Sequence, residues 1–133
     1  MIDHTADVGM DVFGKDLERL FSNAAVAMFH QITVVEALKG DHRERISVKG
    51  LDLPDLMINW LRELLYLWAG EARLIQAAEI VSLSSTGLVA DIRFDTYTPT
   101  RHTIKGEIKA VTYHQVAVQS VPGGWQARII FDV

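Results

Sequence analysis

The first twelve residues alternate between apolar and polar side chains. Side chains of an extended chain point to opposite faces in turn, so this alternation predicts a β-strand at the start of the sequence. One face of that strand carries Asp3, Asp7 and Asp11, which recur at every fourth position, and the other carries apolar residues and His4. The strand therefore combines an apolar face, suited to a core, with a strongly anionic face.

Two later segments have the spacing of three and four residues that is typical of amphipathic helices. The first spans residues 17–28, and Asp16 is placed to cap its N-terminus. The second spans residues 53–68, with a capped start at residues 52–55 and Gly70 as the expected C-terminal stop. Because a domain of this size needs apolar helix faces to cover a sheet, we expect both helices to face the core.

The second half of the chain is rich in strands. Two hairpins are predicted, one from residues 80–83 and 88–94 and one from residues 111–119 and 125–133, and a further strand over residues 44–50. The order is strand, helix, strand, helix and then four or five strands. This order predicts a single α+β domain over residues 1–133, with two layers in which mixed or antiparallel sheets pack against the two helices.

Composition narrows the class of protein. With 133 residues, of which 49% are hydrophobic, the chain can bury a substantial core. It has no cysteine, which excludes disulfides, thiolate metal sites and cysteine nucleophiles. No apolar stretch approaches the roughly 20 residues of a membrane span and no signal-peptide pattern is present, so we expect a cytoplasmic protein without a membrane partner.

The net charge is −4, and the basic residues form no run of the kind that follows a phosphate backbone. Direct, tight nucleic-acid binding is therefore not expected. Protein partners, or a phosphate-bearing ligand bound through a cation, remain open.

The acidic face of the first strand has a counterpart at the end of the sequence. If the last strand pairs beside the first, Asp7, Asp132 and the terminal carboxylate of Val133 converge on one point. Oxygen ligands without thiolates suit calcium, magnesium or manganese. Taken alone, the aspartates of the first strand also fit a solvated face without any ligand, and their coincidence with Asp132 is what favours a metal site. Asp3 lies nearby, whereas His4 has the opposite parity in a regular strand and fits a core or edge position better.

Other polar residues give weaker signals. Arg101, Lys105 and Lys109 recur at every fourth position, which predicts one basic face that serves solubility or contacts an anionic ligand or partner. His102 and His114 lack the spacing of a metal site. The sequence contains no readable Ser–His or Asp–His pairing, so it does not indicate a hydrolytic triad or a nucleophile.

Five segments, in this order along the chain, resemble the archease family. They are residues 3–9 (DHTADVG), 14–18 (GKDLE), 60–67 (WLRELLYL), 105–114 (KGEIKAVTYH) and 129–133 (IIFDV). The resemblance covers essentially the whole sequence. It implies a strand–helix–strand–strand module elaborated with an extra sheet, which agrees with the element order predicted above.

The resemblance implies an accessory protein rather than an enzyme. Its partner would be the RNA-splicing ligase that joins a 3′-phosphate or 2′,3′-cyclic phosphate end to a 5′-hydroxyl end in tRNA splicing and RNA repair. That ligase uses GTP and a metal to load GMP onto its own histidine. The family role is to activate the ligase by promoting this guanylylation step and repeated turnover, through an acidic, metal-binding tip.

Position by position, the resemblance assigns the metal-linked residues to Asp7 and Asp132. The terminal carboxylate of Val133 is a further candidate, and Asp3 and His4 are additional ones.

Lys109 matches a basic position of the family, and with Arg101 it is expected to contact phosphate or the partner. Two alternatives remain open. One is a metal-dependent phosphohydrolase that activates water through Asp7, His4 and Asp132. The other is a scaffold or small-ligand-binding domain whose acidic face is only solvated.

Overall fold

The computed structural model describes residues 6–133. In chain order, the elements are β1 (Asp7–Gly14), α1 (Leu17–Ile32), the short 3-10 helix η1 (Val35–Ala37), β2 (His42–Lys49), α2 (Leu53–Glu71), β3 (Arg73–Ser84), β4 (Gly87–Thr96), β5 (Ala110–Val121) and β6 (Gly124–Asp132). The strands form two antiparallel sheets of three strands, in the orders β1–β6–β5 and β2–β4–β3. The predicted α+β class and element order are confirmed.

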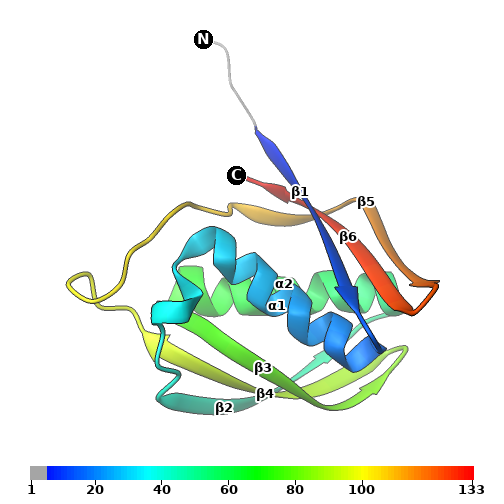
Figure 1. Cartoon of the computed structure of the whole chain (residues 1–133), viewed down its shortest axis with the longest axis horizontal. Coiled ribbons are helices and arrows are strands. Elements are labelled where there is room, and N and C mark those ends of the chain that lie inside the picture. The colour runs from blue at the N-terminus through cyan, green and yellow to red at the C-terminus, as the bar shows by residue number, and fades with distance from the viewer. Residues whose placement is uncertain (1–5) are drawn as a thin grey trace.

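The two helices lie between the two sheets (Figure 1). Helix α1 packs against β1 and β3, and α2 packs against β5, β2 and β3, so the helix pair is covered on both sides. Each helix therefore contributes apolar residues in two directions. Trp60 is fully buried between the helices, and its indole N–H donates a hydrogen bond of 2.9 Å to the carbonyl of Phe21.

Both helices begin where the sequence predicts. The side chain of Asp16 accepts the backbone N–H of Arg19 at 2.8 Å, and the side chain of Asp52 accepts that of Asp55 at 2.9 Å. These bonds satisfy N–H groups that have no partner within the first helical turn. The helix starts are thus determined by local sequence.

The expected stop of α2 at Gly70 is wrong. The helix continues to Glu71 and ends through Ala72, which adopts the left-handed conformation (φ 57°, ψ 39°) and donates its N–H to the carbonyl of Trp68 at 2.9 Å. Gly70 serves packing instead: a Cβ at this position would come within 2.9 Å of Cε1 of Tyr66. The missing side chain lets the tyrosine ring lie against the helix.

The strands are longer than predicted in the middle of the chain. Strand β3 begins at Arg73, seven residues before the predicted start, and shifts register relative to β4 at two places. These irregularities interrupt the alternation of side chains, which is the signal that sequence analysis uses to recognise a strand.

Candidate functional site

The last strand pairs beside the first, as the sequence predicts. Asp7 of β1 and Asp132 of β6 are direct antiparallel partners, and the N–H of Val133 donates to the carbonyl of Ala6 at 3.0 Å. That bond belongs to the neighbouring position of the ladder, so Asp7 and Asp132 form a non-hydrogen-bonded pair, in which side chains lie closest. The two carboxylates therefore leave the same, outer face of the sheet as immediate neighbours.

Within residues 6–133, neither Asp7 nor Asp132 has an ion-pair partner. Like charges placed directly opposite each other destabilise a sheet unless solvent or a cation screens them. Asp11, on the same face of β1, shows the contrast: Arg128 hydrogen-bonds to its carboxylate at 3.0 Å, which lowers the pKa of Asp11 below its ordinary value. Asp7 and Asp132, the acidic pair, thus have no cationic partner among the described residues, whereas the carboxylate of Asp11 is neutralised by Arg128.

The residues of this pair fit a divalent cation only in part. Two carboxylates are hard oxygen ligands, as Mg²⁺ and Ca²⁺ prefer. Among residues 6–133, no group of three His, Asp or Glu side chains comes together to enclose an ion. Mg²⁺ is commonly held by one or two carboxylates, with water and substrate phosphates completing its shell. The pair would therefore hold a cation that shares its coordination with another molecule.

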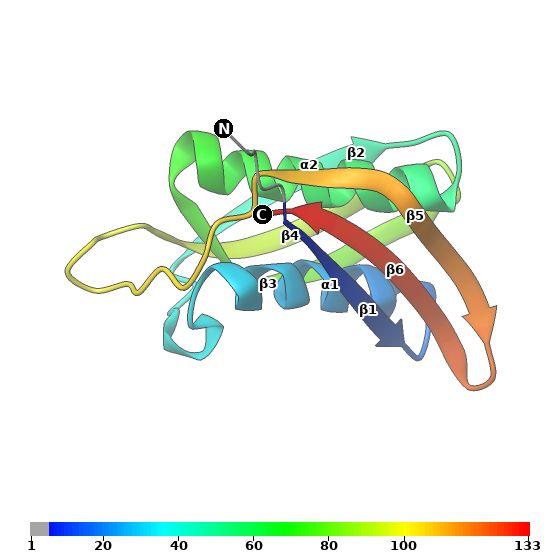
Figure 2. The ribbon, with the colours of Figure 1, turned by 90° about the horizontal axis from the view of Figure 1, so that it is seen from above.

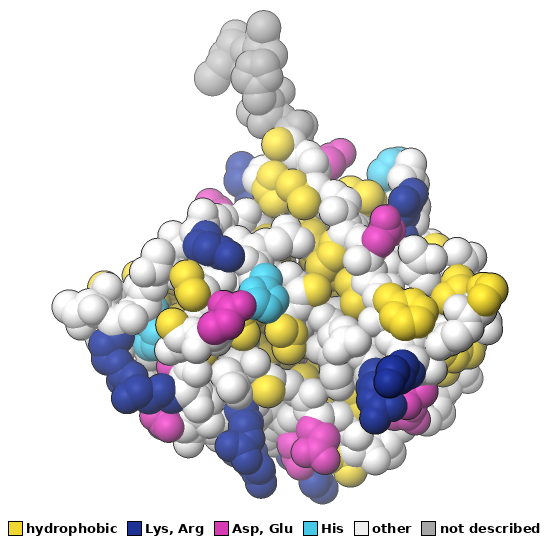
Figure 3. Space-filling view, viewed as in Figure 1, with side chains coloured by type: hydrophobic (Ala, Val, Ile, Leu, Met, Phe, Trp, Pro, Cys, Tyr) yellow, Lys and Arg dark blue, Asp and Glu magenta, His cyan; other side chains and the backbone are white. Residues whose placement is uncertain are grey.

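Of the other predicted ligands, only Val133 lies within the described residues. The main chain of Val133 lies beside Ala6. A carboxylate at Val133 would therefore lie just after β6, next to the acidic pair. Asp3 and His4 lie outside the described residues. The space-filling view shows apolar side chains exposed next to the start of β1 (Figure 3). Val8, on β1, is 37% exposed.

Of the predicted basic residues, only Lys109 lies next to the acidic pair. Its backbone N–H donates to the carbonyl of Asp132 at 2.7 Å. Arg101 lies instead in the loop between β4 and β5, which extends away from the end of β6 in two perpendicular views (Figures 1 and 2). Residues 97–109 form no regular strand or helix there, apart from a bridge at Ile104, so the spacing of four residues does not produce a common face.

A buried Asp–His pair, which the sequence does not predict, links the end of β4 to the loop after it. His102 Nε2 lies 3.0 Å from a carboxylate oxygen of Asp95, and both side chains are almost fully buried. The carboxylate also accepts the N–H groups of Lys39 and Gly40, and His102 Nδ1 accepts the N–H of Thr98 at 2.9 Å. Both imidazole nitrogens are therefore engaged within the protein.

The surroundings keep Asp95 ionised. Burial alone would raise the pKa of its carboxyl, but the hydrogen bonds from Lys39, Gly40 and His102 outweigh it and lower the pKa below the ordinary value. His102 cannot act as a general base while Nδ1 accepts one hydrogen bond and Nε2 donates another. The pair therefore anchors the loop that follows β4.

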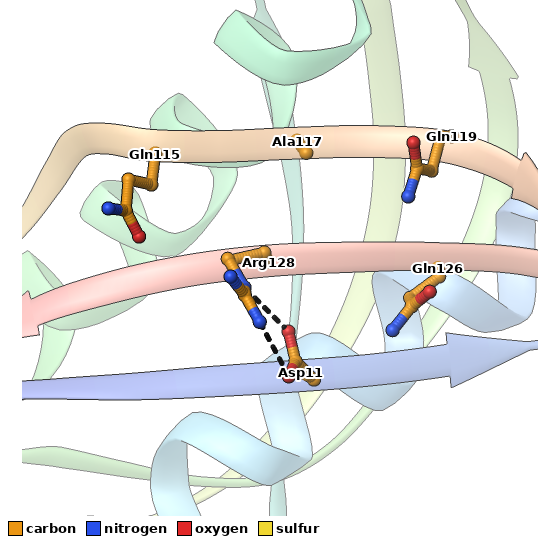
Figure 4. A pocket seen from close by; sticks show the side chains of 6 residues that line it. All are labelled: Asp11, Gln115, Ala117, Gln119, Gln126 and Arg128. Atoms are coloured by element: carbon orange, nitrogen blue, oxygen red, sulfur yellow. Dashed lines mark hydrogen bonds and ion pairs between the residues drawn. The ribbon is translucent and has the colours of Figure 1, made fainter.

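The outer face of the β1–β6–β5 sheet carries a second polar feature, a hollow of about 470 Å³. The Asp11–Arg128 ion pair and three glutamines, Gln115, Gln119 and Gln126, line it (Figure 4). These side chains come from three strands and gather only through strand register. The pattern within any one strand does not by itself bring these side chains together.

Strand β5 bulges beside this hollow, and Gln115 of the bulge is one of the lining residues. Thr112 pairs with Ile130 and Ala117 with Arg128, so four residues of β5 stand opposite one residue of β6. Within the bulge, Gln115 adopts a left-handed conformation with φ of 52°.

The sequence matches the Archease protein family (MTH1598/TM1083) over residues 1–133. The chain belongs to the archease family. It is 32% identical to Protein archease of Methanosarcina mazei over 136 residues, covering 99% of this chain and 93% of that protein. It is also 32% identical to Protein archease of Pyrococcus abyssi over 135 residues, covering 98% and 95% of the two chains.

Solved structures support the archease fold. The solution structure of Methanobacterium thermoautotrophicum protein 1598 has a TM-score of 0.81 and 29% identity, and the match covers 99% of this chain and 96% of that one. An archease of Thermotoga maritima, described as a "possible chaperone", has a TM-score of 0.69 at 18% identity, which bears on the fold alone. Among residues 6–133, no helix is long and apolar enough to cross a membrane.

Proposed function

We propose that this archease activates the GTP-dependent RNA ligase that joins 3′-phosphate or 2′,3′-cyclic phosphate ends to 5′-hydroxyl ends in tRNA splicing. It acts in the cytoplasm as a non-catalytic partner that promotes guanylylation of the ligase and its repeated turnover. Membership of the archease family carries this proposal, and the position of Asp7 opposite Asp132 supports it.

The acidic pair supports a divalent cation at the point of contact. A bound calcium, magnesium or manganese ion would supply positive charge that phosphate oxygens can share. Asp7 and Asp132 would hold the ion on the outer face of the sheet, and a carboxylate at Val133 would be a third ligand. Because the protein closes its coordination only in part, the ion remains accessible to a partner's phosphate groups.

An accessory role also agrees with the buried Asp95–His102 pair. A hydrolase that worked through this histidine would need a free ring nitrogen within reach of water or substrate. Here Thr98 and Asp95 occupy both nitrogens. His102 is thus not available as a general base, and in the proposed role the chemistry on RNA belongs to the ligase, whose site this protein adjusts.

The test is covalent loading of GMP onto the purified cognate ligase, with and without this protein. Asp7→Asn and Asp132→Asn are expected to reduce stimulation by about tenfold or more, the usual scale for weakening a metal site. Glu79→Gln is the matched control. Glu79 of β3 also stands directly opposite an aspartate, Asp91 of the neighbouring strand β4, but in the other sheet. It should leave stimulation unchanged.

Full stimulation by both aspartate variants would contradict the role of the acidic pair. Absence of stimulation by the parent protein would contradict the proposed function itself. Cation-dependent hydrolysis of phosphate esters by the isolated protein would instead support the phosphohydrolase alternative.

A further inference from the structure

A groove of about 480 Å³ runs along the edge strand β5 beside α2. Its walls include Arg62, Tyr66 and Ala69 from α2, and Lys109, Ala110 and Val111 from the segment that begins β5. The side chains of Ala69 and Ala110 are short and occupy little of the space on either side. The volume lies within the range of sites that bind small molecules.

Arg62 is held in one orientation at the edge of this groove. Its Nε–H donates to the carbonyl of Val111 at 3.0 Å, and its guanidinium carbon lies 4.6 Å from the centre of the Tyr113 ring. Tyr113 is fixed in turn, because its hydroxyl donates to Asp55 at 2.7 Å. No hydrogen bond within residues 6–133 uses the terminal nitrogens of Arg62, so these donors are oriented in advance and available to a ligand.

Lys109 and Tyr66 complete the groove. The backbone of Lys109 is fixed by its hydrogen bond to Asp132, while its side chain is exposed. Tyr66 is 57% exposed, and its ring lies against Gly70 on the helix surface. Two cationic groups and one exposed aromatic ring thus share a single groove.

We propose that this groove binds a nucleotide, with the phosphate between Arg62 and Lys109 and the base against Tyr66. Free guanidinium N–H groups match phosphate oxygens in geometry and charge, and a base gains free energy by stacking on an aromatic ring. An acidic peptide would use the cations but leave the ring without a role. These observations are independent of the ligase, so the site stands even if the proposed function fails.

The first test is titration of the isotope-labelled protein, followed by NMR, with adenosine monophosphate, inorganic phosphate and adenosine. Adenosine monophosphate should shift the amide signals of Ala69, Ala110 and Val111 with saturable binding. Inorganic phosphate should shift the same signals more weakly, and adenosine should bind weakest because it lacks the charged group.

Variants assign the contacts. Lys109→Gln and Arg62→Lys should each weaken binding of adenosine monophosphate by at least about fivefold, since each removes a charge-assisted or bidentate contact. Tyr66→Ala should reduce the advantage of adenosine monophosphate over inorganic phosphate and leave phosphate binding itself unchanged. Lys49→Gln, on β2 of the other sheet, is the control and should bind as the parent protein does.

The source of the nucleotide is distinguished by a further pair of probes. A short RNA with a 3′-phosphate that binds more tightly than the same RNA with a 3′-hydroxyl, and more tightly than adenosine monophosphate, identifies an RNA end as the ligand. The reverse order identifies a free nucleotide.

Thermal melting keeps the test decisive for Arg62, because its side chain also contacts Val111 and Tyr113. Binding by Lys109→Gln and by a folded Arg62→Lys variant at the parent affinity would overturn the proposal. So would the absence of shifts at the groove with every probe.

Discussion

His102 donates its Nε2 proton to Asp95 while its Nδ1 accepts the N–H of Thr98, at 3.0 and 2.9 Å. The backbone donor at Nδ1 fixes the tautomer, because that nitrogen must be unprotonated. The same carboxylate accepts the N–H groups of Lys39 and Gly40. The buried side chain of Asp95 thus connects the segment before β2 to the loop that leads to Lys109.

Asp95→Asn is expected to destabilise the protein by about 2 kcal/mol, the scale of hydrogen bonds to a buried charged group. If the amide oxygen accepts from Lys39 and Gly40, its NH₂ group faces the N–H of His102. Reversing the tautomer of His102 only moves the conflict to Thr98. Denaturant unfolding at neutral pH measures the loss, with the exposed Asp41→Asn as a control that should change stability little.

Acid should remove the contribution of Asp95. Its pKa in the folded protein lies below the ordinary value near 3.8, so it stabilises the fold above that value and ceases to do so as pH falls through the lower, folded pKa. The parent protein should therefore lose stability more steeply than Asp95→Asn below about pH 4. Unfolding midpoints measured along a pH series check this, and parallel curves for the two proteins would contradict it.

A divalent cation should raise the melting temperature if Asp7 and Asp132 hold it. At an ion concentration of about ten times the dissociation constant, binding adds about 1.4 kcal/mol to the free energy of unfolding. This corresponds to a rise in melting temperature of roughly 4 °C for a chain of this size. The double variant Asp7→Asn with Asp132→Asn should lose this response. Without cation it should be at least as stable as the parent protein, because the like-charge contact is gone. An unchanged cation response in the double variant would rule out the acidic pair as the site.

Ala72→Gly should stabilise the protein by about 0.5 kcal/mol. Ala72 caps α2 with φ of 57°, where an L-residue meets steric strain that glycine avoids, although glycine also gains entropy in the unfolded chain. Thermal unfolding gives the sign, and Ala69→Gly, inside the same helix, should change stability in the opposite direction.

Tyr113→Phe should raise the pKa of Asp55 toward its ordinary value. The tyrosine hydroxyl is the leading cause of the lowered pKa, ahead of the N–H of Leu51. The phenylalanine ring keeps the contact with the guanidinium of Arg62. Carboxyl titration by NMR measures the change, and Arg45→Gln, on the other sheet, should leave the pKa of Asp55 where it is.

The sequence predicts well those features that depend on neighbouring residues or on strict alternation. Asp16 and Asp52 act through N–H groups three residues away, so each helix start is legible from a few letters. The face shared by Asp7 and Asp11 follows from the period of a strand. Even the approach of Asp132 to Asp7 follows once the last strand is placed beside the first.

Features that depend on the path of the chain escape such analysis. Asp95 and His102 meet because the loop between β4 and β5 folds back, and nothing in that polar segment predicts its turn. Arg62 belongs to the groove because α2 lies along the edge of β5, whereas the spacing of Arg101 and Lys109 suggests a different partnership. A glycine such as Gly70 is typical of a helix end, but here its missing side chain makes room for the ring of Tyr66.

The acidic pair joins residues 125 positions apart, Asp7 and Asp132, through the first and last described strands. All three strands of the other sheet are available once residue 96 has been made. On the ribosome, β1 must therefore wait unpaired until β6 emerges, because it has no other strand partner among the described residues. Products of interrupted translation would lack the paired carboxylates, so only a chain translated through β6 can present them.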